Sequence, residues 1–298
     1  MPLLLLLLTP LVSAFAAEPY RILDPLAVPA QGDPASAVLT LARPARIPRI
    51  DCDLVIAGGG LGGVAAALAG ARGGLHVCLT EPTRWLGGQM TSQGVSALDE
   101  NRWIETTGAT RTYLELRARI RAAYAASLKP EARAGHVNPG RCWVSALCFE
   151  PQVAVDVLDG MLAPYRANHA LRVLLRTAPV AAARAGNRLA ALVVYGFEDR
   201  RFTELRGKIF IDATELGDLL PLAGAAFRTG AESRAETGEP DAPGAPDPAA
   251  LQSFTYPFVL ARGAGPGIDV RRPADYENAR RQFRFVIDYG QGRLLRYA

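Results

Sequence analysis

A run of glycines between two apolar segments constrains the fold of this chain more than any other feature. Residues 53–57 (DLVIA) predict a short buried strand, and residues 64–72 predict a helix of small side chains. Between them, Gly58, Gly60 and Gly63 have the spacing G-x-G-x-x-G. In this pattern the first glycine permits a tight turn, the second lets a pyrophosphate approach the backbone, and the third allows the helix to lie close to the strand. The N–H groups and the positive dipole end of the helix N-terminus then favour a phosphate.

A second strand and an acidic residue follow at the distance that a dinucleotide-binding unit requires. Residues 75–80 predict this strand, and Glu81 ends it 23 residues after Gly58. A carboxylate there accepts hydrogen bonds from the hydroxyl groups of an adenosine ribose and repels a 2′-phosphate. Strand, turn, helix, strand and acid in this order predict a βαβ unit that binds a dinucleotide. The alternative interpretation is a structural glycine turn followed by a surface glutamate.

Two later segments indicate which dinucleotide this is. The doublet Gly87-Gly88 suits a backbone that passes close to a large cofactor. Residues 208–211 predict a further buried strand that ends in Asp212-Ala213-Thr214, at the carboxyl edge of the sheet where ligands bind in such folds. Polar side chains after the doublet supply hydrogen-bonding groups for the edge of a flavin, or else ordinary turn and cap contacts: Gln89, Thr91, Ser92 and Gln93.

With these residues in place, the chain resembles the FAD-dependent oxidoreductases of the glutathione-reductase-like FAD/NAD(P)-binding superfamily. It is most similar to a bacterial family with the signature LGGxxTS after the second strand, and the resemblance covers residues 51–260. It implies an α/β fold, in which a Rossmann-like FAD-binding parallel sheet carries inserted helices and a β-meander and leads into the beginning of a second, substrate domain. Val180 matches the position whose backbone meets the adenine. The predicted cofactor-binding residues are Gly58, Gly60, Leu61, Gly62, Gly63, Glu81, Gly87, Gly88, Gln89, Thr91, Val180, Ala213 and Thr214.

The sequence departs from the family pattern in two places. Glu215 stands where the family has the glycine of Ala-Thr-Gly. A side chain there is expected to crowd the cofactor or to alter the turn. The C-terminal Gly-Asp segment that contacts the ribityl chain in the superfamily is not found, because Gly217-Asp218 directly follows the preceding strand. We therefore expect a chain that lacks the C-terminal part of the family pattern.

The resemblance implies noncovalent FAD and an enzyme that transfers hydride from a small-molecule substrate to flavin. No histidine or cysteine stands beside the glycine doublet to form a covalent flavin link. The three histidines, His76, His136 and His169, have no neighbouring partners that mark a base, so the catalytic residues stay unassigned. Two alternatives stay open. One is a truncated or degenerate exported flavoprotein without activity, and the other is an NAD-dependent dehydrogenase, against which the glycine doublet argues.

Four segments organise the chain. Residues 1–16 predict a signal peptide, 17–50 an extended lead-in with a short strand at 37–41, 51–225 the FAD-binding domain, and 226–298 a loop and a partial substrate domain. The cofactor domain holds a helical insertion at about 96–170. Further elements are predicted from periodicity and turn residues: helices at 104–126, after Pro151 and at 271–285; strands at 171–175, 189–195, 201–205 and 251–261; and a loop at 231–250.

The N-terminus has the pattern of a Sec-type signal peptide. Leu3 to Leu8 are consecutive leucines, and Ala14-Phe15-Ala16 fits the small-x-small rule for cleavage before Ala17. No lysine or arginine precedes the leucines, and the apolar run is too short for the ~30 Å core of a bilayer. The expectation is an exported protein without a stable membrane span after cleavage, and the alternative is an uncleaved anchor or a different start codon.

Cysteines and charges exclude several classes of site. Cys52 and Cys78 fall in predicted strands, and we expect buried thiols there; Cys142 and Cys148 are expected to be free and packed, with a disulfide as the alternative. No ligand spacing predicts a metal site. The net charge is 33 − 29 = +4 without a basic stripe, which argues against nucleic acid.

Charged side chains around the 104–126 helix are expected at the surface: Asp99, Glu100, Glu105, Arg117, Arg119 and Arg121.

Overall fold

A computed structural model describes most of the chain, and its described residues belong to two compact units, residues 1–258 and 259–298. The described residues are 18–27, 33–125, 137–140, 142, 144–253, 257, 272–282, 288–289 and 292–293. The predicted signal peptide, His136 and most of the predicted strand at 251–261 lie outside them.

A four-stranded parallel sheet forms the centre of the first unit. Its strand order is β10-β4-β5-β6, from Ile209–Asp212, Leu54–Ala57, Val77–Glu81 and Leu171–Leu175. Every neighbouring pair is parallel, with Ile56 opposite both Leu79 and Ile211. Every residue of β4 and β5 is buried because both faces of the sheet are covered, and apart from Thr80 and Glu81 at the end of β5 all of these residues are apolar. The predicted α/β class is confirmed.

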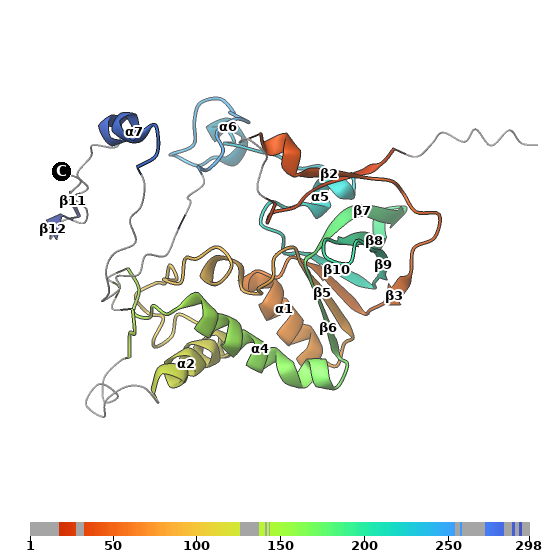
Figure 1. The fold of residues 1–298 in the computed structure, drawn as a ribbon, viewed down its shortest axis with the longest axis horizontal. Coiled ribbons are helices and arrows are strands. Elements are labelled where there is room, and N and C mark those ends of the chain that lie inside the picture. The colour runs from red at the N-terminus through yellow and green to blue at the C-terminus, as the bar shows by residue number, and fades with distance from the viewer. Residues whose placement is uncertain are drawn as a thin grey trace, which may run out of the picture. The chain divides into compact units, whose positions relative to one another are not determined.

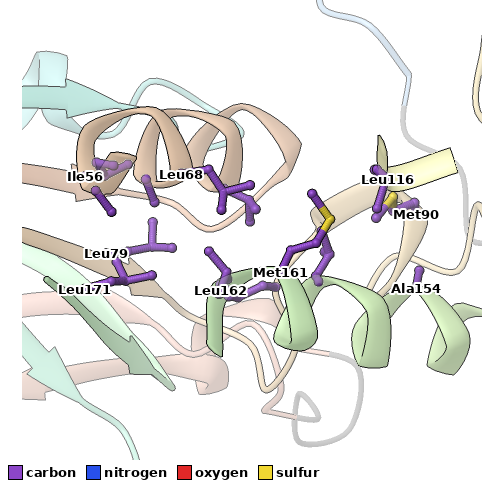
Figure 2. Packing of buried hydrophobic residues seen from close by; sticks show 14 of the residues in the cluster. Ile56, Leu68, Leu79, Met90, Leu116, Ala154, Met161, Leu162 and Leu171 are labelled. Atoms are coloured by element: carbon purple, nitrogen blue, oxygen red, sulfur yellow. The ribbon is translucent and has the colours of Figure 1, made fainter. Parts of the chain in front are cut away.

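Helices cover one face of this sheet (Figure 1). Helix α1 (Leu61–Arg72) follows the glycine turn, and α4 (Pro151–Ala167) begins with proline at its first turn, where the missing N–H costs nothing. Helix α2 (Arg111–Ala125) lies against α4 and is shorter than predicted, since residues 101–109 form turns. Figure 2 shows the resulting core, in which Leu68 of α1 and Leu162 of α4 meet Leu79 of β5.

An antiparallel layer covers the opposite face. Its strand order is β3-β9-β8-β7, from Arg49–Asp51, Phe202–Arg206, Arg188–Gly196 and Thr177–Ala185. Strands β7, β8 and β9 are antiparallel, whereas β3 pairs with β9 in parallel, and the name antiparallel layer refers to all four. Leu192 and Leu205 of this layer pack with Val55 and Ala57 of β4. The predicted β-meander is present, but β3 and β7 were missed. Strand β7 reads TAPVAAARA, and alanine and proline give little strand signal.

The lead-in folds back on this layer as a hairpin. Strands β1 (Tyr20–Leu23) and β2 (Val38–Leu41) pair in antiparallel register, with the short 3₁₀ helix η2 (Pro34–Ala37) before β2. The strand at 37–41 is confirmed and β1 is new. Tyr20 and Ile22 pack with Val180 and Tyr195 of the antiparallel layer.

The cysteine predictions were wrong in the structure. Cys52, in the link between β3 and β4, forms a disulfide with Cys78 of β5, with 6.1 Å between their Cα atoms. Cys142 and Cys148 form a second disulfide, with 6.0 Å between their Cα atoms. No cysteine is free. The sequence predicts two buried thiols for the first pair, because both positions fit apolar residues in or next to predicted strands. That reading located them correctly, since both are buried, but missed that adjacent strands bring the two sulfurs together.

The surface prediction for the charged groups around α2 was also partly wrong. The Arg117 side chain is 2% exposed and forms ion pairs with Glu100 and Glu105, and the Glu100 side chain is 4% exposed. Arg121 is partly buried and also pairs with Glu105. Asp99 and Arg119 have the expected exposed setting, and Arg119 pairs with Glu115.

The remaining elements are short. In the first unit, α5 (Leu219–Leu222) follows β10, and α6 (Arg234–Thr237) lies in the predicted 231–250 loop. In the second unit, α7 (Tyr276–Gln282) falls within the predicted helix at 271–285, and β11 (Asp288–Tyr289) pairs with β12 (Gly292–Arg293). Among the described residues, no helix is long and apolar enough to cross a membrane, and no cluster of three or more potential metal ligands occurs.

Candidate functional site

The glycine turn stands at the carboxyl ends of β4, β5 and β10, and two of its glycines are required by the fold itself. Gly58 has φ +96°, and a Cβ there would lie 2.2 Å from the carbonyl oxygen of Ala213. A Cβ at Gly63 would lie 2.0 Å from the carbonyl oxygen of Gly58. No side chain fits at either position, so these glycines hold α1 against the turn and against the end of β10.

The middle of the turn is open instead. Gly60 is the N-cap of α1, with φ −61° and ψ −178°, a conformation that any residue adopts. A Cβ at Gly60 would meet only an oxygen of Glu215, at 3.3 Å, and a Cβ at Gly62 would meet nothing within 4 Å. The first N–H groups of a helix, here from Leu61 onward, have no intrahelical partner. The open face of the turn therefore combines free space with a positive dipole end.

Glu81 stands beside this turn at the end of β5, as predicted, and it is buried with 5% exposure. One of its carboxylate oxygens accepts a hydrogen bond from the Gly59 N–H at 2.9 Å, and the other accepts one from the Thr83 N–H at 2.8 Å. The sequence did not predict these two contacts. Each oxygen keeps a second lone pair for a ligand hydroxyl, so Glu81 both fixes the turn and offers an acceptor.

The glycine doublet lies against the same turn. The Gly87 N–H donates to the carbonyl oxygen of Gly59 at 2.8 Å, and Gly60 and Gly87 form an isolated parallel bridge. Both Gly87 and Gly88 have positive φ, at +109° and +55°. The doublet therefore lies beside the cradle, a name used below for the open face formed by Gly60 and Gly62. Gly88 is itself buried, and a Cβ there would lie 3.0 Å from the Cα of Gly60.

Two polar residues after the doublet have different settings. The Thr91 hydroxyl is buried and donates to the carbonyl oxygen of Leu86 at 2.7 Å, so it stabilises the loop from within. Gln89 is exposed. Of the two predicted contacts, Gln89 has its side chain at the surface of the site and Thr91 does not.

The end of β10 contributes a hydrogen-bonded turn organised by Asp212. One oxygen of Asp212 accepts from the N–H and the hydroxyl of Thr214, and the other accepts from the N–H of Leu219 at 3.0 Å. The Asp218 N–H donates to the Thr214 hydroxyl. Burial, and then the charge of Asp212, raises the pKa of Asp218. Ala213 and Thr214 are thereby held against Gly58. The sequence did not predict this role of Asp212, because the family motif assigns cofactor contacts only to the two residues that follow it.

Glu215 extends from this turn towards the cradle. Its Oε1 atom accepts a hydrogen bond from the Gln93 side-chain amide at 3.0 Å. The same atom is 3.0 Å from where a Cβ at Gly88 would lie. The departure from the family pattern at this position therefore places a carboxylate at the predicted cofactor site.

The other candidate residues lie elsewhere. Val180 is at a register shift of β7, where it packs in the cluster with Tyr20. His76 is exposed, with Nδ1 3.3 Å from an oxygen of Asp53. Hydrogen bonds from Lys208 and from the His76 N–H lower the pKa of Asp53 to about 2. Asp53, His76 and Lys208 line a cavity of about 650 Å³ that begins at the amino ends of the strands, away from the glycine turn.

Comparisons with known proteins agree with this arrangement. The family described as FAD dependent oxidoreductase matches residues 53–287. No curated protein matches the chain. Similar solved structures include L-proline dehydrogenase from P. horikoshii, with 18% identity, 58% of this chain and 24% of that chain covered and a TM-score of 0.33. Another is OxyS anhydrotetracycline hydroxylase from Streptomyces rimosus, with 16% identity, 60% and 35% covered and a TM-score of 0.40.

A third is adenylylsulfate reductase from Archaeoglobus fulgidus, with 20% identity, 56% and 31% covered and a TM-score of 0.36. The chain thus spans about a third or less of the length of these three proteins, and the likeness is too low to carry an argument beyond the family match. That match covers most of the chain and includes the strand, the glycine turn, Glu81, the glycine doublet and the end of β10. The chain belongs to the family of FAD-dependent oxidoreductases, whose cofactor is FAD.

Proposed function

We propose that the chain binds FAD noncovalently and supports an oxidoreductase reaction in which a small substrate gives hydride to the flavin. The observation that carries this proposal is the cradle, where two glycines that the fold does not need leave open space at the N-terminus of α1. This space fits the pyrophosphate, and the helix N–H groups supply its hydrogen bonds. When bound, the flavin supplies the hydride acceptor.

The residues around the cradle have distinct roles in this proposal. Glu81 accepts hydrogen bonds from the adenosine ribose while it holds Gly59 and Thr83. Gly87 and Gly88 let the backbone run beside the cofactor, and Gln89 presents an exposed amide next to it. Val180 belongs to the proposal only through the family resemblance. The substrate and the groups that contact it are not assigned.

Binding of FAD by Gly60→Val tests the proposal. The wild-type protein is expected to quench flavin fluorescence and to be stabilised against heat by FAD, and not by NAD. Valine at Gly60 adopts the backbone conformation without strain and meets no backbone atom, so the variant folds but fills the cradle. We expect loss of FAD binding at an unchanged melting temperature of the free protein. Glu81→Ala is a less clean test, because it also removes two contacts of the turn.

A matched control is Gly160→Ala on α4, where a Cβ would meet nothing within 4 Å. This variant should bind FAD as the wild type does. Wild-type protein that leaves flavin fluorescence and its own melting temperature unchanged would overturn the proposal. Stabilisation by NAD instead of FAD would favour a nicotinamide-dependent dehydrogenase.

We further propose export by a cleaved Sec-type signal peptide. The run Leu3 to Leu8 and the cleavage motif before Ala17 are the sequence basis. The pairing of all four cysteines supports the proposal, because disulfides persist in oxidising compartments. N-terminal sequencing of protein secreted by a bacterial host tests it, and the expected first residue is Ala17.

A further inference from the structure

Glu215 places a negative charge on the open face of the cradle. Its Oε1 atom is 3.3 Å from where a Cβ at Gly60 would lie and 3.0 Å from where one at Gly88 would lie. No other atom stands within 4 Å of that Gly60 position. The carboxylate thus occupies the space that the glycines leave free.

The surroundings of this carboxylate hold it there without fixing it. The Gln93 amide donates to it at 3.0 Å, which links the loop after β5 to the turn after β10. A carboxylate at a helix N-terminus is favoured by the helix dipole. The Glu215 residue is nevertheless exposed, and no ion pair of its side chain is found among the described residues. It can therefore swing into solvent at small cost.

We propose that Glu215 is an internal substitute for the cofactor phosphates, so that its carboxylate must leave the cradle before a dinucleotide binds. The inference rests on the proposed FAD binding and states what limits its affinity. A pyrophosphate brings further negative charge to the same few ångströms of space, and like charges at such distances repel strongly even near a protein surface. Glu215 consequently lowers the affinity of the chain for FAD, and it does so by charge.

The experiment compares the dissociation constant for FAD, measured by flavin fluorescence, of the wild type, Glu215→Gln and Glu215→Ala. Glu215→Gln keeps the size of the side chain and removes its charge, and we expect it to bind FAD about tenfold more tightly. Glu215→Ala is expected to bind at least as tightly as Glu215→Gln. The control Glu239→Gln removes one negative charge from an exposed position in the 231–250 loop and should leave the affinity unchanged.

Salt and a second ligand test the electrostatic cause. The gap between wild type and Glu215→Gln should shrink at high ionic strength, because salt screens exposed charges. ADP, which carries the pyrophosphate without the flavin, should show the same gap when it competes with FAD.

The outcomes separate this inference from the proposed function. Wild type and Glu215→Gln that bind FAD with equal affinity, or a variant that binds more weakly, would overturn the role of Glu215 and leave FAD binding intact. If neither protein binds FAD or ADP, the proposed function fails and this inference with it. Binding that is seen only in the variant would support the role of Glu215 and would overturn FAD binding by the wild-type chain.

Discussion

At the scale of single residues, the glycine turn contains glycines that the fold requires and glycines that it does not require. Gly58 and Gly63 are needed because backbone oxygens lie where their side chains would be. Gly60 and Gly62 are not needed by the protein, and their open space is what a ligand uses. Gly58 and Gly63 are therefore required by the fold, whereas Gly60 and Gly62 leave space for a ligand.

Gly63→Ala is expected to destabilise the free protein, whereas Gly62→Ala is not. At Gly63 the added methyl meets the Gly58 carbonyl oxygen at 2.0 Å, and α1 must shift. Strain of this kind costs about 1–3 kcal/mol or more. At Gly62 the methyl meets nothing, and alanine in a helix is favoured over glycine by about 0.5–1 kcal/mol.

Urea denaturation of both variants without cofactor measures the difference. The free energy of unfolding should fall for Gly63→Ala and stay level or rise for Gly62→Ala. Equal effects of the two substitutions would show that the close contact at Gly63 is relieved by a small movement.

At the scale of elements, α2 is attached to the loop before it by a buried ionic cluster. Arg117 pairs with Glu100 and Glu105, the Tyr113 hydroxyl donates to Glu100 at 2.7 Å, and the Ser145 hydroxyl donates to the same carboxylate. Burial, followed by the hydrogen bond to Glu100, raises the pKa of Tyr113. The cluster fixes the segment that leads from the glycine doublet into the helical insertion.

Sequence periodicity located this cluster without identifying it. Position 117 follows position 113 by four residues, so it shares the buried face with Tyr113 and Leu116. The charge of an arginine nevertheless favours a solvent-exposed position, and the sequence therefore predicted a solvated face for Arg117. Buried ion pairs need partners outside the helix, here Glu100 and Glu105, and no helical pattern carries that information. Strand β3 was missed for a similar reason, since its pairing partner β9 lies far away in the sequence.

Removal of Arg117 should destabilise the protein far more than removal of Arg119. Arg117→Met leaves buried carboxylates without their cation, which typically costs about 3–5 kcal/mol. Arg119→Ala breaks an exposed i,i+4 pair with Glu115, worth about 0.3–0.5 kcal/mol. Chemical denaturation of the two variants gives the comparison. A loss below 1 kcal/mol for Arg117→Met would mean that the cluster contributes no stability.

The same cluster predicts acid sensitivity. The hydrogen bond from Arg121, and then the contacts with Arg117, lower the pKa of Glu105 from 4.5 to about 2. A carboxyl group with a lowered pKa in the folded state stabilises that state above its ordinary pKa, and this contribution disappears as the pH falls towards the folded value. The free energy of unfolding should therefore decline between pH 4.5 and about 2.

Glu105→Gln tests this assignment. The variant should be less stable at neutral pH and should show a shallower decline over the same pH interval. An unchanged slope would assign the acid sensitivity to other carboxylates.

At the scale of the first unit, two layers enclose the parallel sheet, and the sequence predicted these layers better than the covalent bonds and long-range contacts that connect them. The apolar runs of β4 and β5 and the glycine turn were sufficient for the sheet, its α1 cover and the position of the cradle. The pairing of β3 with β9 and the Cys52–Cys78 disulfide depend on contacts between distant segments. Cys52 and Cys78 lie in the core between the two sheets, where Val55, Leu192 and Leu205 surround them.

Reduction of the disulfides is expected to lower the stability of the whole first unit. Cys52–Cys78 closes a loop of 26 residues and Cys142–Cys148 one of 6 residues. Loops of these lengths correspond to roughly 3 and 2 kcal/mol in the chain-entropy account. Denaturation in urea with and without a reductant measures the summed contribution of both disulfides, and the double substitution C142S/C148S leaves only the Cys52–Cys78 bond.

Protein made in an oxidising compartment should show no free thiol after unfolding, and two free thiols per chain would show that one of the two disulfides does not form. Because the Cys52–Cys78 bond lies at the amino ends of β4 and β5, away from the glycine turn, we expect the loss of either disulfide to lower stability without changing the FAD affinity of the folded protein.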